Sequence, residues 1–187
     1  LMYAPNGLPL NTSSQSKIIT EKESYSYSDL ERLSIHYCSF LKPRTLTIFF
    51  GSNTFESLAF YIAAINCETP LILLPSTSDI SQSKNIISLY RPLCIFSQLP
   101  LDFLGYKQVA PDIYIADEYT VLDDRDSSLP LLLLPTSGST GSPKLVKVSS
   151  TNLFSNTISI SKYLNICNHS RHITTLPLSY TYGLSCI

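Results

Sequence analysis

The chain has 187 residues, of which 44% are hydrophobic and 14% are charged, so its length suits one domain with a substantial core. Its formal net charge is -1 and it has no basic cluster, which argues against nucleic acid and anionic membranes as partners. It also lacks a signal sequence and any apolar run near the roughly 18 residues of a membrane-spanning helix, so we expect a cytoplasmic protein.

The start of the chain differs in character from the rest. Residues 1–22 contain prolines, a glycine and several hydroxyl residues without periodicity, which predicts an entry arm on the surface. Residues 23–187 are expected to form a single domain. Ser28 and Glu31 make a capping-box pattern, which predicts a helix that ends before Pro43.

Beyond this helix, short apolar runs alternate with segments of helical periodicity. This alternation predicts an α/β domain with a mostly parallel sheet covered by helices. Asn53 is expected to cap a second helix, and Ser150 or Thr151 a helix that ends near Tyr163. The predicted strands cover residues 45–50, 71–74, 93–96, 113–115, 131–134 and 172–176. The side chains expected inside the sheet are Leu46, Ile48, Ile72, Leu73, Ile95 and Leu132.

Metal and disulfide sites are not indicated. Asp123, Asp124 and Asp126 lack the glycine and glutamate of a calcium loop, and the segment 167–172 offers one cysteine and two histidines but no fourth ligand. The cysteines are odd in number and contain no C-x-x-C pair, so we expect buried free thiols. These cysteines are Cys38, Cys67, Cys94, Cys167 and Cys186.

The most informative stretch runs from residue 131 to 149. An apolar run breaks into hydroxyls and glycines and resumes as an alternating run after Lys144, which predicts a strand, a loop and a second strand. Gly138 and Gly141 let the backbone approach a ligand, successive N–H groups can form an anion-binding nest, and Lys144 adds a positive charge. This chemistry suits phosphate, although a plain turn between two strands is the alternative.

The string Thr136-Ser-Gly-Ser-Thr-Gly-Ser-Pro-Lys144 resembles the phosphate-loop signature of the adenylate-forming superfamily, which includes acyl- and aryl-coenzyme A ligases. The resemblance implies the N-terminal part of the large domain of an enzyme that activates a carboxylic acid with ATP and Mg²⁺. Coenzyme A or a carrier-protein thiol is then the possible acceptor. The residues implied in ATP binding are Thr136, Ser137, Gly138, Ser139, Thr140, Gly141 and Lys144.

Two further segments resemble this family. Residues 53–75 resemble an N-x-x-E helix that runs into a strand, and residues 176–184 resemble the loop that borders the acyl pocket. In that loop Tyr180 stands where many relatives carry histidine and Gly183 falls on the family glycine, so both are implied in substrate binding. A core-filling aromatic turn is the alternative. Pro135 and Leu145 also depart from the family pattern.

The chain stops at Ile187 directly after an apolar stretch. We therefore expect a piece of a longer protein, which alone is inactive because the family's adenine and magnesium contacts would follow Ile187. The cut surface is expected to favour self-association. A non-catalytic binding or assembly module that has kept the fold is the alternative function.

Overall fold

The computed structural model describes residues 17–76, 80–123, 130–135, 144–167, 170–179 and 181–184, without the side chains of residues 80–82 and 181–182. This part of the chain has an α/β fold, as the alternating pattern predicts, built on a seven-stranded mixed sheet in the order β6-β7-β5-β3-β4-β8-β9. The strands are β3 (Thr47–Gly51), β4 (Leu71–Pro75), β5 (Cys94–Ser97), β6 (Tyr106–Ala110), β7 (Ile113–Ala116), β8 (Leu132–Pro135) and β9 (Leu145–Val148).

The centre of the sheet is parallel and its edges are antiparallel. Strands β5, β3, β4 and β8 run in the same direction, with Ile48 of β3 opposite both Ile72 of β4 and Ile95 of β5. β9 pairs antiparallel with β8 on one side, and β7 and then β6 extend the other side. The near-continuous apolar character of the central strands reflects burial on both faces.

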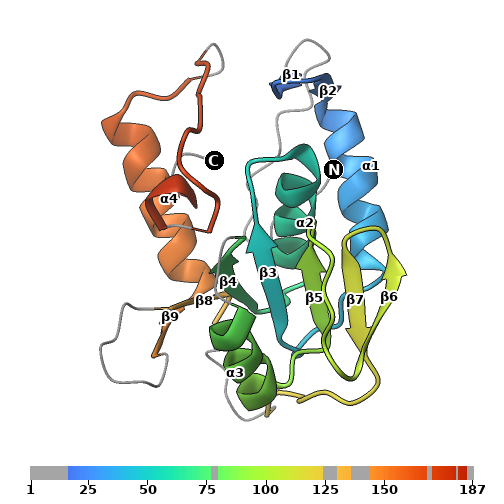
Figure 1. Ribbon diagram of the computed structural model, residues 1–187. Coiled ribbons are helices and arrows are strands. Elements are labelled where there is room, and N and C mark those ends of the chain that lie inside the picture. The colour runs from blue at the N-terminus through green and yellow to red at the C-terminus, as the bar shows by residue number, and fades with distance from the viewer. Residues whose placement is uncertain are drawn as a thin grey trace.

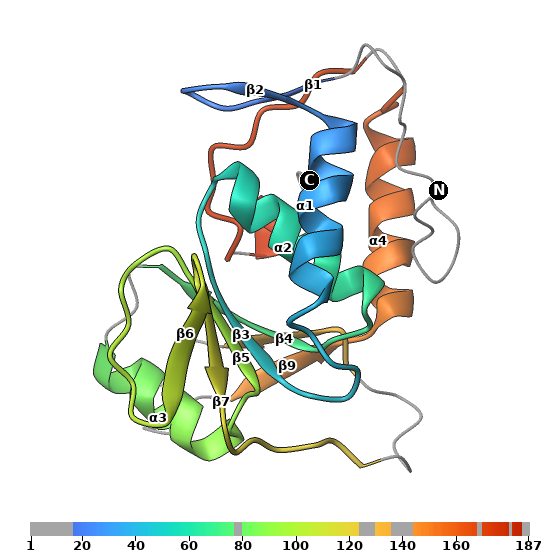
Figure 2. The ribbon, with the colours of Figure 1, turned by 90° about the vertical axis from the view of Figure 1, so that its right-hand side faces the viewer.

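Helices cover the two faces of this sheet. α1 (Tyr27–Cys38) and α2 (Phe55–Asn66) pack on one face, and α3 (Ile80–Tyr90) lies on the other (Figures 1 and 2). Successive β3 residues serve opposite faces, because Phe49 belongs to the core beneath α1 and α2 whereas Ile48 and Phe50 belong to the core beneath α3. All six residues expected inside the sheet are buried, with at most 4% of their surface exposed.

Four further elements complete the described part of the fold. β1 (Lys17–Ile19) and β2 (Ser24–Ser26) form a separate antiparallel pair that leads into α1. α4 (Ser150–Tyr163) follows β9 and has no buried residue, and the short helix α5 (Thr181–Leu184) lies near the end of the chain. Figure 1 shows α4 beside the sheet and not stacked on α1 and α2.

The predicted strand at residues 172–176 is wrong. The structure has no strand there, and residues 171–177 are exposed, with 83% of the Ile173 side chain open to solvent. A strand is stable only when its backbone groups pair with a neighbour, and none of the described strands pairs with this segment. The residue types of 172–176 alone therefore did not determine its conformation.

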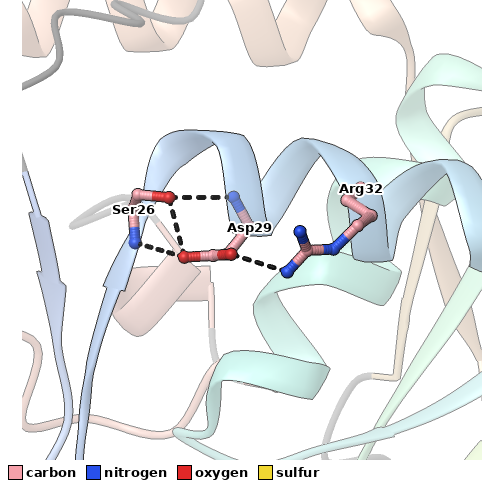
Figure 3. A network of polar contacts seen from close by, with 3 residues as sticks. All are labelled: Ser26, Asp29 and Arg32. Atoms are coloured by element: carbon pink, nitrogen blue, oxygen red, sulfur yellow. Dashed lines mark hydrogen bonds and ion pairs between the residues drawn. The ribbon is translucent and has the colours of Figure 1, made fainter.

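The predicted helix starts are displaced by one or two residues. α1 is capped by Ser26 and not by Ser28: the Ser26 hydroxyl accepts a hydrogen bond from the Asp29 N–H at 3.1 Å, and the Asp29 carboxylate accepts from the Ser26 N–H at 2.9 Å (Figure 3). Thr54 caps α2 in place of Asn53, and Ser149 caps α4. Each cap is an extended residue whose hydroxyl reaches the N–H three residues ahead.

The expectation of buried free thiols holds for one cysteine. Cys94 is buried in β5, whereas Cys38 and Cys67 are half-buried and Cys167 is exposed. Cys186 lies outside the described residues, as do Asp124 and Asp126. Where the chain is described, no three His, Cys, Asp or Glu side chains gather in a way that could hold a metal ion. None of the helices in the same ranges has the length and apolar character needed to cross a membrane.

Candidate functional site

The parallel strands define where a ligand would bind. β3, β5 and β8 end at Gly51, Ser97 and Pro135, and their carboxyl ends share one edge of the sheet because the strands are parallel. Ligands of open α/β sheets bind at this edge. The loops that leave these three strands are therefore the candidate site.

The predicted phosphate-binding segment connects two paired strands. β8 and β9 form an antiparallel ladder in which Leu132 lies opposite Val148 and Pro135 lies opposite Leu145. The strand, loop and strand pattern is thus confirmed at both flanks. Residues 136–143, which include Thr136 to Gly141, lie outside the described residues. Lys144 is exposed and comes directly before β9, so its backbone is tied to the sheet one residue later.

Hydroxyl and amide groups gather where β3 and β5 end. The side-chain carbonyl of Gln98, just after β5, accepts hydrogen bonds from the hydroxyls of Ser52 at 2.5 Å and Thr54 at 3.0 Å. Ser57, in the first turn of α2, contacts the same oxygen at 3.5 Å and is fully buried. These contacts fix the loop after β3 and the start of α2 against the end of β5. Sequence reasoning missed Gln98, because a polar residue in a loop carries no signal of a partner more than 40 positions away.

Asn53 connects the same loop to the predicted acyl-pocket segment. Its side-chain N–H donates to the backbone carbonyl of Leu176 at 3.0 Å, and its side-chain oxygen accepts from the backbone N–H of Leu178 at 3.1 Å. A side-chain amide offers the same donor and acceptor pair as a peptide group, so it can bond to the N–H and the C=O of this backbone at once. Thr54 performs the capping, which leaves the Asn53 side chain available for this contact.

Position 183 of this segment has no room for a side chain, so it requires glycine. It is buried in α5, and a β-carbon at this position would lie 2.3 Å from the backbone oxygen of Pro177 and 3.0 Å from that of Leu176. Any larger residue would push the two parts of the segment apart. The described contacts of Gly183 therefore shape the segment, and Tyr180, the other predicted substrate-binding residue, lies outside the described residues.

The interior of the segment carries one unpaired polar atom. Leu178 and Leu184 pack into the core beneath α1 and α2, and they anchor the segment to the domain. Between them Ser179 is 7% exposed, and its hydroxyl has no hydrogen-bond partner among the described residues. A buried hydroxyl without a partner is unfavourable. The hydroxyls of Ser34 in α1 and Thr47 in β3 are unpaired among the described residues in the same way, so this feature does not by itself mark a ligand site.

The acidic groups near this edge influence one another. The carboxyl group of Asp112, in the turn between β6 and β7, has its pKa raised above the ordinary value, first by burial and then by the negative charge of Glu56 in α2. The Asp112 backbone carbonyl accepts a hydrogen bond from the Ser97 N–H at 2.9 Å, which ties this turn to the end of β5. Asp112 therefore places a carboxyl group on the β5 side of the sheet, away from Lys144, which directly precedes β9.

The fold is that of an α/β domain with a candidate ligand site at the carboxyl edge of its parallel strands, and the comparison with protein families gives the family. The model of the AMP-binding enzyme family matches residues 12–187. The chain therefore belongs to the AMP-binding enzyme family, as the phosphate-loop string predicted. No curated protein sequence matches it.

Solved structures of adenylate-forming enzymes share the fold. O-succinylbenzoate coenzyme A synthetase (MenE) from Bacillus subtilis, in complex with AMP, matches with a TM-score of 0.70 and 19% identity over 89% of this chain and 47% of that one. Apo MatB from Rhodopseudomonas palustris matches with a TM-score of 0.66 and 16% identity over 88% of this chain and 37% of that one. VinN matches with a TM-score of 0.68 and 15% identity over 92% of this chain and 49% of that one. This chain thus spans less than half of each structure.

Proposed function

We propose that the protein activates a carboxylic acid with ATP, forms an acyl-adenylate and pyrophosphate, and passes the acyl group to a thiol of coenzyme A or of a carrier protein. The observation that carries this proposal is the position of the string Thr136–Lys144. It joins β8 to β9 directly after a parallel strand, in a chain of the AMP-binding enzyme family. Relatives support the cofactor, since structures of MenE with ATP and magnesium and of MatB with ATP have the same fold.

In this reaction the substrate carboxylate attacks the α-phosphorus of ATP, and negative charge accumulates on the departing pyrophosphate. Backbone N–H groups and hydroxyls of Ser137 to Thr140 would donate to the β- and γ-phosphates, while the glycines permit close approach. Lys144 would supply a compensating charge from a backbone held by β9. Magnesium, when bound, would neutralise the remaining phosphate charge, and we assign its protein ligands to sequence outside these 187 residues.

The acyl group would lie against the segment 176–184. Asn53 holds this segment to the loop after β3, and Gly183 keeps it folded back on Pro177. We propose that Tyr180 borders the acyl group and that Gly183 shapes the pocket wall. MenE in complex with the acyl-adenylate OSB-AMP and VinN in complex with 3-methylaspartate support a small carboxylic acid as the substrate class.

We further propose that the 187 residues alone do not complete the reaction. The chain spans 47% of the MenE structure, so we assign the remaining contacts to ATP to sequence outside these 187 residues. The division into an entry arm over 1–22 and a domain over 23–187, the cytoplasmic location and self-association of the piece remain predictions.

Carboxylate-dependent exchange of labelled pyrophosphate into ATP tests the proposed function. The assay is performed with the protein that contains this chain and a panel of small aliphatic, aromatic and amino-dicarboxylic acids. Exchange that requires one class of acid supports the proposal. Absence of exchange with every acid, combined with retained binding of ATP, would instead favour the non-catalytic module.

A further inference from the structure

Two cysteine sulfur atoms lie side by side on the helical face of the domain, away from the candidate site. Cys38 is the last residue of α1 and Cys67 is the C-cap of α2, and their Sγ atoms are 2.7 Å apart. A disulfide bond measures about 2.05 Å, so the two sulfur atoms need to move only about 0.7 Å closer to bond. The two residues are 29 positions apart in sequence, so the packing of the helices creates this proximity.

The backbone holds both cysteines in place. The N–H of Cys67 bonds to the Ala63 carbonyl at 2.9 Å as the helix ends, and the Cys38 thiol donates to the same carbonyl at 3.6 Å. An aromatic contact fixes α1 on α2 next to this point: Tyr37, the neighbour of Cys38 in α1, packs edge-on against Phe60 of α2 with ring centroids 5.4 Å apart. The proximity of the two thiols is therefore a property of the packed helix pair and not of two mobile side chains.

The two cysteines are partly open to solvent. Both cysteines are half-buried, in contrast to Cys94, which is fully covered in β5. We propose that Cys38 and Cys67 are a redox-active dithiol site that closes reversibly into a disulfide between α1 and α2. The site would take small-molecule disulfides, such as oxidised glutathione, as the oxidant.

The exchange proceeds in two steps that balance. The thiolate of Cys38 attacks one sulfur of the small disulfide, the S–S bond of that molecule breaks, and one small thiol leaves with a proton from solvent. The thiol of Cys67 then loses its proton and attacks Cys38 Sγ, which releases the second small thiol. The protein dithiol is oxidised by two electrons, and the small disulfide is reduced to two thiols.

The order of attack follows from the surroundings of the second thiol. Burial, together with the neighbouring Cys38, raises the pKa of Cys67 to about 12, so its thiol is a weak nucleophile at neutral pH. We therefore assign the first attack to Cys38 and the closing step to Cys67. The disulfide would join the C-terminal end of α1 to the C-terminal end of α2. Asn53 and Thr54 make their contacts at the opposite, N-terminal end of α2.

A glutathione redox titration tests this site on the full chain. The protein is equilibrated at fixed ratios of reduced to oxidised glutathione, free thiols are blocked with iodoacetamide, and the digested protein is mapped by mass spectrometry. We expect a peptide pair joined through Cys38 and Cys67. Because native packing holds the thiols together, the equilibrium constant for closing should be at least about tenfold higher in the native protein than in urea.

Variants separate this site from the other cysteines. Cys167→Ser removes an exposed thiol and should leave the Cys38–Cys67 crosslink unchanged. Cys38→Ser should abolish it and leave Cys67 as a free thiol. The oxidised wild-type protein should also melt several degrees above the reduced one, and Cys38→Ser should show no such difference.

Three outcomes would overturn the proposal. The first is complete alkylation of both thiols at every glutathione ratio, and the second is mixed disulfides with glutathione that never close. The third is an equilibrium constant for formation of the Cys38–Cys67 disulfide that is the same in the native protein and in urea. The wild-type map and the urea comparison need no variant, so a variant that fails to fold does not affect them.

Discussion

The side-chain oxygen of Asn53 accepts a hydrogen bond from the backbone N–H of Leu178 at 3.1 Å, across 125 positions of sequence. The same amide group donates to the Leu176 carbonyl at 3.0 Å. Asn53 thereby links the loop after β3 to the segment that precedes α5. Because Leu178 is buried in the core whereas Asn53 is exposed, the contact orients a segment that is already anchored.

The first prediction concerns the two hydrogen bonds between Asn53 and the backbone of Leu176 and Leu178. Asn53→Ala removes both hydrogen bonds, and it should lower the free energy of unfolding by about 1 kcal/mol, because the site is exposed. Asn53→Ser should cost as much, although serine is a good N-cap, because its hydroxyl is too short to replace an amide that makes both contacts. Denaturation in urea measures these changes. Equal stability of Asn53→Ser and wild type would mean that Asn53 acts through capping and not through the contact with Leu178.

The second prediction tests Lys144. If this residue compensates the charge on the β- and γ-phosphates, Lys144→Ala should lower kcat/KM for ATP by about 100-fold in the complete enzyme, by analogy with the loss of one oxyanion-hole donor. The KM for the carboxylic acid should change little. Lys147→Ala is the matched control, because Lys147 is also exposed and lies in β9. Unchanged ATP kinetics in Lys144→Ala would reduce the segment 136–144 to an ordinary turn.

The third prediction concerns Gly183. The added methyl group of Gly183→Ala meets a backbone oxygen at 2.3 Å, so the segment must shift, at a cost of about 1–3 kcal/mol. We also expect a higher KM for the carboxylic acid, because the displaced segment borders the proposed acyl site. Gly105→Ala is the control: nothing lies within 4 Å of its added carbon, and its cost comes only from the positive φ of 86°. It should leave the KM unchanged.

The fourth prediction separates the two serines at the start of α1. Ser26→Ala removes the capping hydroxyl and should destabilise the protein by about 1 kcal/mol. Ser28 is exposed inside the first turn, so Ser28→Ala should be neutral or slightly stabilising, since alanine is the better helix former. Thermal melts of the two variants measure the difference. The reverse order of stability would restore Ser28 as the cap.

The fifth prediction concerns pH. The pKa of Asp112 is raised in the folded state above its unfolded value of 3.8. At pH values between these two pKa values, the folded protein therefore binds more protons than the unfolded chain. Stability is therefore lost as pH rises through this window. Asp112→Asn removes the partly buried charge, and asparagine tolerates the φ of 64°, so this variant should be more stable than wild type at pH 7 and equally stable well below pH 3.8.

A control for this effect is Asp117→Asn, since Asp117 is exposed and forms a surface ion pair with Lys107. It should bring no gain at pH 7. Urea denaturation at pH 3 and pH 7 provides the comparison. A gain from Asp112→Asn that persists unchanged at pH 3 would show that its cause is not the charge.

Local pattern alone determined the strands of the central sheet. The apolar runs around Ile48, Ile72 and Ile95 are too continuous for a surface and too short for helices, so burial as parallel strands was the consistent interpretation. The flanks of the phosphate-binding segment followed from the same reasoning, because an apolar run and an alternating run on either side of glycines read as paired strands. The family also followed from that one string of residues.

Only the tertiary structure decided the rest, because the deciding partners are distant in sequence. β6 shows no apolar signal, since its central residues are exposed at the sheet edge, and it exists because β7 supplies its hydrogen bonds. The segment 172–176 was predicted to be a strand and is irregular without such a partner. The sequence predicted Asn53 as a helix cap, whereas the structure shows its side chain bonded to Leu178. Cys38 and Cys67 are neighbours only because α1 packs on α2. Local preferences bias the backbone by about 1 kcal/mol per residue or less, and contacts across the fold outweigh them.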